Sequence, residues 1–89
     1  MNAEAAWRLH PQVSIRPEPF GALLYHFGTR KLSFLKDRVL LDVVERLGTA
    51  PSARAACDAA GVPESDRARY LAALGTLADS HMIERWDHR

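Results

Sequence analysis

The spacing of apolar residues changes at Lys36, and this change constrains the fold more than any other feature of the 89-residue sequence. Before Lys36, apolar residues tend to alternate with polar ones, and short runs are separated by Pro and Gly, as in strands joined by turns. After Lys36, apolar residues recur at steps of three and four, as on the buried face of a helix. The sequence therefore predicts an α+β protein in which strands are followed by helices.

The first part predicts three strands, at about residues 13–16, 22–27 and 31–35. The connections between them are short enough to force antiparallel neighbours, so we expect a three-stranded antiparallel meander. The middle strand is apolar on both faces, which suits a central strand covered on one side by helices. The other two strands are then the edges of the sheet.

Three helices are expected in the second part, within about residues 37–79. Asp37 is a candidate N-cap of the first helix, and Gly48 follows where a left-handed C-terminal residue is expected. Ser52 opens the second, Ala-rich helix, and Gly61 ends it. The capping residues alone thus set the boundaries of two helices.

The third helix is expected from about residue 64 to about residue 79, with Pro63 at its start. Together with the second helix it has the proportions of a helix-turn-helix. Residues 80–89 predict a polar, loosely held tail that keeps Met82, Ile83 and Trp86 for packing.

Length and composition indicate a single domain over residues 1–89, of ordinary globular composition and with a formal net charge of +1. This charge gives no global basic field of the kind that drives non-specific nucleic-acid binding. The lone Cys57 cannot form an intrachain disulfide, which favours a reducing compartment. We find neither a secretory signal nor a membrane span, so a cytoplasmic protein without a membrane partner is expected.

Residues for catalysis, for a metal or for a cofactor are not recognisable in the sequence. The four histidines, at positions 10, 26, 81 and 88, lack the spacing that places two imidazoles on one helical face. Cys57 is expected to be an inert core thiol, and the scattered glycines form no phosphate-binding loop. The sequence therefore argues against an enzyme.

Sequence-specific DNA binding is the alternative that the helix-turn-helix proportions raise. The opening of the third helix offers Arg67 and Arg69, but Glu64 and Asp66 lie beside them and leave the segment without net positive charge. In addition, the hairpin that usually follows the recognition helix of a winged DNA-binding protein is not recognisable here.

The last predicted strand, Lys31–Leu35, is an edge, and an edge left open is a template for strand addition. Leu32 and Phe34 would point to one face, and Ser33 and Leu35 to the other. The simpler interpretation of the apolar residues in this strand is that they belong to the core, and it fits Phe34 best.

Backbone pairing with this edge would bind a peptide only weakly. Five hydrogen bonds contribute about 5 kcal/mol in all, whereas ordering a flexible peptide costs about 2–5 kcal/mol. Apolar anchors are therefore expected to enter a cleft between the strand and the side of the third helix that carries Tyr70, Leu74 and Leu77.

Charge around the edge strand would steer an acidic peptide towards it. The segment around this strand contains four cationic residues and one anionic residue, Asp37, which gives it a local net charge of +3. The cations are Arg30, Lys31, Lys36 and Arg38.

The residues from Val13 to Lys36, VSIRPEPFGALLYHFGTRKLSFLK, resemble the mycofactocin precursor-peptide chaperones. These are a branch of the ribosomal-peptide recognition elements that includes the pyrroloquinoline quinone chaperone. The resemblance covers nearly the whole chain. It is most specific in RPEPFG through Tyr25 and His26 and in Leu32–Lys36, and only generic in the Ala-rich helices.

The resemblance implies a winged-helix-like peptide recognition element without catalysis or cofactor. Such a protein would bind the leader of a short precursor peptide and present the peptide to a radical-SAM maturase, which would itself hold the iron–sulfur cluster. Peptide-binding residues carried over by the resemblance are Lys31, Leu32, Ser33, Phe34 and Leu35 on the strand, and Arg67, Tyr70, Leu71 and Leu74 on the third helix. The turn Pro17-Glu18-Pro19 is either a rigid turn or a maturase contact.

Overall fold

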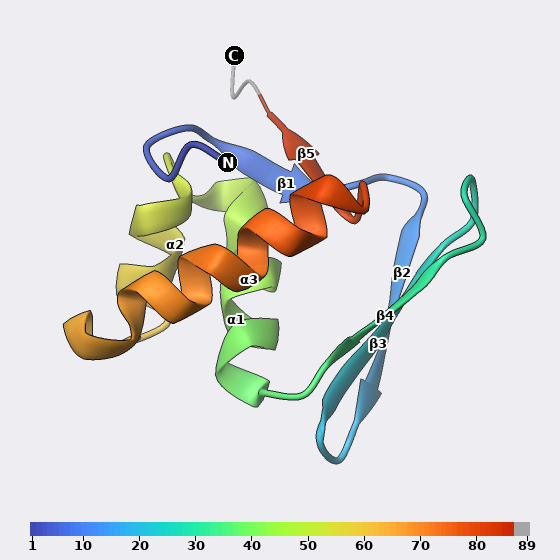
Figure 1. Cartoon of the computed structure of the whole chain (residues 1–89), viewed down its shortest axis with the longest axis horizontal. Coiled ribbons are helices and arrows are strands. Elements are labelled where there is room, and N and C mark those ends of the chain that lie inside the picture. Colours follow the sequence, from blue (N-terminus) through green and yellow to red (C-terminus); the bar gives the residue numbers. More distant parts are fainter. Residues whose placement is uncertain (87–89) are drawn as a thin grey trace.

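The computed structural model of the chain describes residues 1–86 and has an α+β architecture with two small antiparallel sheets and three helices (Figure 1). One sheet has the order β2-β3-β4, and the other pairs β1 with β5. The strands are β1 (Trp7–Leu9), β2 (Val13–Glu18), β3 (Gly21–His26), β4 (Leu32–Leu35) and β5 (Ile83–Arg85). The expected α+β class, with a three-stranded antiparallel sheet and three helices, is confirmed.

The three-stranded sheet buries one face against the helices and has β3 at its centre, as expected. Ala22 and Leu24 of β3 are fully buried, and Leu35 of β4, which is paired with Ala22, is 2% exposed. These side chains share one face because side chains alternate along a strand. That face packs on α1 (Arg38–Arg46).

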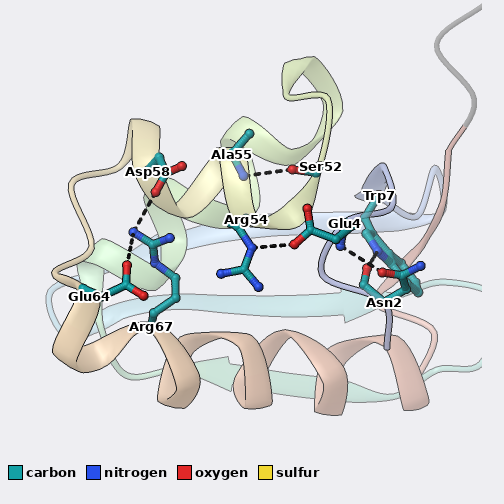
Figure 2. Close-up of polar contacts among 9 residues, drawn as sticks. All are labelled: Asn2, Glu4, Trp7, Ser52, Arg54, Ala55, Asp58, Glu64 and Arg67. Carbon is teal, nitrogen blue, oxygen red and sulfur yellow. Dashed lines mark hydrogen bonds and ion pairs between the residues drawn. The ribbon is translucent and has the colours of Figure 1, made fainter.

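The helices begin at their predicted caps. The Asp37 carboxylate accepts a hydrogen bond from the Val39 N–H, and the Ser52 hydroxyl accepts one from the Ala55 N–H at the start of α2 (Ala53–Ala59; Figure 2). Gly61 ends this helical segment with a φ of 78°, in the left-handed region that favours glycine. A 3₁₀ turn (Glu64–Asp66) then leads into α3 (Arg67–Asp79).

The expectation of a left-handed residue at Gly48 was wrong. The chain continues from α1 into a 3₁₀ turn (Leu47–Thr49), and the Ala50 N–H closes it by bonding the carbonyls of Arg46 and Leu47. The 3₁₀ turn thus supplies a hydrogen-bond partner for carbonyl groups at the end of α1, so no residue with a positive φ is required there.

The expected packing of Met82 and Ile83 is confirmed, since these side chains are 0% and 1% exposed. The expectation that the rest of the tail is loosely held was wrong for residues 83–85, because β5 pairs with β1, so the strands do not all precede the helices. In Figure 1, β5 lies beside β1 at the top of the view, whereas the three-stranded sheet runs down the right-hand side. Each of the two strands has three residues, too few for their alternation to be recognised in the sequence. Residues 87–89, the end of the predicted tail, lie outside the described part of the chain.

Candidate functional site

The β4 strand is an open edge, and its backbone offers hydrogen-bonding groups there. The His26 N–H donates to the Lys31 carbonyl at 3.0 Å, and the register pairs Leu24 with Ser33. Because donors alternate along an antiparallel ladder, the amide groups of Ser33 point towards β3, whereas those of Leu32 and Phe34 point outward. Within residues 1–86, no strand pairs with β4 on that outward side.

The side chains of β4 alternate between the two faces of the sheet, as expected. Leu35 is buried and Ser33 is half-buried on the face that meets the helices, whereas Leu32 and Phe34 are 54% and 58% exposed on the other face. The core interpretation of Phe34 was therefore wrong. The helices cover only one face of this thin sheet, so an apolar residue of the opposite register stays in contact with solvent.

Two adjacent hollows lie between β4 and α3, and together we call them the β4–α3 groove. They have volumes of about 310 and about 270 Å³, and they adjoin at Leu40 and Ala73, which line both. The first hollow is also lined by Ser33, Phe34, Leu35, Thr76 and Leu77, and the second by Lys36, Asp37, Arg69 and Tyr70.

One end of the groove is apolar and the other end is polar and basic. Leu35 and Leu77 are buried in the apolar hollow, where a side chain from a ligand would lose contact with water. Lys36 and Arg69 lie in the other hollow, and the Arg69 guanidinium carbon is 5.2 Å from the centre of the Tyr70 ring. Asp66 is near Arg69, at 3.5 Å, but the Arg69 side chain is 71% exposed and stays accessible.

A hydrogen bond from the Tyr70 hydroxyl to the Asp37 carboxylate spans the basic hollow. Partial burial opposes ionisation of Asp37, but bonds from Tyr70 and from the N–H groups of Val39 and Leu40 outweigh it and lower the pKa of this carboxyl. The same bond raises the pKa of Tyr70, with burial acting in the same direction. At neutral pH, a carboxylate and a phenol therefore join the end of β4 to α3.

The four α3 residues of the predicted site are placed differently from one another. Tyr70 lines the groove, whereas Leu74 is fully buried in the core and Leu71 packs against the core without lining either hollow. Arg67 is 8% exposed. The structure thus brings Tyr70 next to the β4 strand and places the other three elsewhere.

Arg67 holds α2 and α3 together. Its guanidinium donates to the Val62 carbonyl at 3.0 Å and lies 2.7 Å from an Asp58 oxygen, with Glu64 at 3.9 Å (Figure 2). If the helix-turn-helix bound DNA through Arg67, this guanidinium would have to lie at the surface. In the structure it faces the protein.

The sequence reasoning did not assign Lys36, Leu40, Arg69, Ala73 and Thr76 to the site. Arg69, Ala73 and Thr76 are spaced by four and three residues, which places them on one face of α3. That spacing is the only signal in the sequence for these three residues. It could be interpreted only once the structure showed that the hydrogen bond between Asp37 and Tyr70 holds the end of β4 beside α3.

The described residues show no arrangement for metal chemistry: residues 1–86 contain no group of three or more His, Cys, Asp or Glu that could hold an ion. Cys57 is buried, and its burial raises the pKa of the thiol, which opposes formation of a nucleophilic thiolate. Among the described residues, no helix has the length and apolar character needed to cross a bilayer.

Comparison with known proteins gives one consistent result. The profile of the peptide chaperone MftB family matches residues 6–84. Proteins named peptide chaperone MftB from Mycobacterium ulcerans, Mycobacterium tuberculosis and Mycolicibacterium smegmatis are 64%, 61% and 60% identical over 82 residues. The aligned region covers 92% of this chain and 75%, 75% and 80% of these relatives. No solved structure matches the chain.

Proposed function

The chain belongs to the peptide chaperone MftB family, and we propose that it binds the leader of a ribosomally made precursor peptide by strand addition to β4. Its relatives are named for a chaperone role, which is not catalytic. The proposal extends this role to a particular ligand and a particular edge of the sheet. It also makes the chain a carrier that presents the peptide to a radical-SAM maturase in mycofactocin biosynthesis.

The observation that carries the proposal is the outward direction of the Leu32 and Phe34 amide groups directly beside the β4–α3 groove. Two residues offer two donors and two acceptors, worth roughly 0.5–1.5 kcal/mol each. Ordering a flexible peptide costs about 2–5 kcal/mol, so these bonds alone leave little net affinity. The groove supplies the anchoring that backbone pairing lacks.

An added strand would place alternate side chains over the groove, as Ser33 and Leu35 do in β4. An apolar side chain would enter the hollow lined by Leu35 and Leu77. An acidic side chain would meet Lys36 or Arg69 at the basic end. The leader is therefore expected to combine an apolar anchor with an acidic residue further along the same face.

Lysines at both ends of β4 favour a foreign acidic strand over a second copy of this chain. Lys31 precedes the strand and Lys36 follows it, and both are exposed. If two copies paired antiparallel along β4 with Leu32 opposite Phe34, Arg30 of one copy would lie opposite Lys36 of the other, and like charges directly opposite destabilise a pair of strands. An acidic leader would instead be attracted at both ends.

Two proline variants test strand addition directly, by calorimetric titration with the synthetic leader. Leu32→Pro removes an outward N–H and should weaken binding at least fivefold, since about 1 kcal/mol is lost with one hydrogen bond. Leu32→Ala is the matched control for the lost side chain. Ser33→Pro removes an inward N–H and should instead loosen the pairing of β3 with β4.

The informative comparison is between Leu32→Pro and Leu32→Ala, provided that both keep the circular dichroism spectrum of the wild type. Equal leader affinities in these two variants would show that the outward amide is not used. Binding would then occur on a surface other than the β4 edge.

A further inference from the structure

The face of the three-stranded sheet that points away from the helices is an exposed aromatic surface. Phe20 and Phe27 are 45% and 61% exposed, and Leu32 and Phe34 lie on the same side. These are four of the six large apolar side chains that are exposed among the described residues. We call this surface the outer face, formed by Phe20, Leu23, Tyr25, Phe27, Leu32 and Phe34.

Cross-strand pairing gathers these side chains. The register sets Leu23 opposite Phe34 and Tyr25 opposite Leu32. The rings of Phe20 and Phe34 have their centres 6.4 Å apart, and those of Tyr25 and Phe27 meet edge to face at 4.9 Å. Aromatic side chains that are already packed together lose little freedom on binding, which is typical of protein–protein contact surfaces.

The charges that border the outer face have mainly one sign. Arg16 lies on this face and pairs with Glu18 at 3.0 Å, while Arg30 and Lys31 stand exposed at the far end of the sheet. Two copies packed face to face would bring these cations together. A partner with carboxylates around an apolar centre fits the surface better.

In β4, the backbone and the side chains of Leu32 and Phe34 belong to different surfaces. The outward amide groups of Leu32 and Phe34 lie beside the groove, whereas the side chains of the same residues belong to the outer face. A strand added to β4 would place every second side chain next to Phe34 on the outer face. A partner bound there would contact the chain and its peptide together.

We infer that the outer face docks the enzyme that receives the carried peptide, through an apolar surface bordered by acidic residues on that enzyme. The inference rests on the proposed function for the identity of the enzyme, the radical-SAM maturase. It adds the surface and the chemistry of the contact. The groove lies on the helix-covered side of the sheet and shares only Phe34 with the outer face, so the peptide and the enzyme bind without competing.

The test compares maturase affinity with leader affinity in a double variant, Phe20→Ser with Phe27→Ser. Neither residue belongs to β4 or lines the groove, so leader affinity should stay within twofold of the wild type. Affinity for the purified maturase, measured with and without saturating leader, should fall more than about tenfold if these rings are central contacts. Val39→Ser is the matched control, because Val39 is an exposed apolar residue of α1, outside the outer face.

A second variant, Arg16→Gln, keeps the apolar surface and removes a bordering charge. It should weaken maturase binding at low salt and reduce the dependence of the affinity on ionic strength. This variant keeps the test valid if the double variant changes the thermal unfolding of the chain.

Two results would overturn the inference: wild-type affinity of the double variant for the maturase, or a wild-type dimer in sedimentation that the double variant dissociates. The second result would assign the face to another copy of the chain. Failure of the wild-type chain to bind the leader would contradict the proposed function instead, and the titration of maturase without leader would still test the outer face.

Discussion

The Tyr70 hydroxyl of α3 donates a hydrogen bond to Asp37, the residue that follows β4 and caps α1. One carboxylate thus joins the three elements that surround the groove. Because the contact lies at the basic end, it holds α3 at a set separation from the end of β4. The width of the candidate peptide site therefore depends on this pair.

Replacement of Tyr70 by Phe should lower the free energy of unfolding by about 1.5–3 kcal/mol at pH 7, the range for a hydrogen bond to a charged group. The pKa of Asp37 is lowered in the folded state, so the folded chain binds this proton less tightly than the unfolded chain. The stabilisation is present above the ordinary carboxyl pKa near 3.8 and is lost as the pH falls below it. The difference between Tyr70→Phe and the wild type should therefore shrink in acid.

Urea unfolding at pH 7 and at pH 3 measures this difference. Tyr25→Phe is the matched control, because Tyr25 lies on the outer face, away from Asp37. A Tyr70→Phe variant as stable as the wild type at pH 7 would contradict the role given to this bond.

His26 should make the fold sensitive to mild acid. Its side chain is 3% exposed, and Nδ1 accepts hydrogen bonds from the Gly28 and Thr29 N–H groups at 3.0 and 3.1 Å. Burial, followed by repulsion from His10 and His81, lowers the pKa of His26 below 6.5. The unfolded chain therefore binds the proton more tightly, and stability should decline as the pH falls below about 6.5.

The variant His26→Asn keeps a side-chain acceptor at a similar place but removes the titrating ring. Its unfolding midpoint should be lower at every pH because the side chain is smaller, yet it should change less between pH 7.5 and pH 5.5 than that of the wild type. The measurement is thermal unfolding across this range. An unchanged pH dependence would exclude His26 as the cause.

Arg67 and Arg69 are two residues apart and are expected to have opposite roles. Arg69→Ala should weaken leader binding by a factor of about 2–5, the value of an exposed ion pair, and the loss should diminish in high salt. Arg67→Ala should leave leader affinity unchanged but lower the unfolding free energy by about 1–3 kcal/mol, because its hydrogen bond to the Val62 carbonyl is buried. Calorimetry and urea unfolding on both variants separate the two roles, and a reversed pattern would refute the assignment.

Gly21 is the glycine on which the approach of β3 to β4 depends. Its φ is 152°, and a Cβ there would lie 2.0 Å from the Leu35 carbonyl oxygen. Gly21→Ala should therefore cost more than about 2 kcal/mol, whereas Gly48→Ala, where a Cβ meets no atom within 4 Å, should be nearly neutral. Denaturant unfolding of the two variants checks this, and equal stabilities would show that the strand pairing tolerates a side chain at Gly21.

The sequence predicted the features that depend on near neighbours. Asp37 and Ser52 were recognisable as caps and Gly61 as a helix end, because capping is decided within a few residues. The pairing of Trp7 with Arg85 was missed, because three-residue strands leave too little alternation and their contact spans the chain.

The side-chain detail of the site depends on tertiary packing and could be predicted only in part. The edge strand was placed correctly next to the third helix, as the shared lining of the groove shows. The rotation of α3 decides whether Arg67 or Arg69 faces β4, and apolar spacing did not determine it. Phe34 has a large apolar side chain of the kind found in protein cores, but its exposure depends on which face of the sheet the helices cover.

The most direct test of strand addition is amide-resolved hydrogen exchange of the labelled chain with and without saturating leader. If the leader pairs with β4, the Leu32 and Phe34 amides should gain protection, while the Ser33 amide, which already points towards β3, should change least. Unchanged exchange at Leu32 and Phe34 under saturation would contradict strand addition at β4.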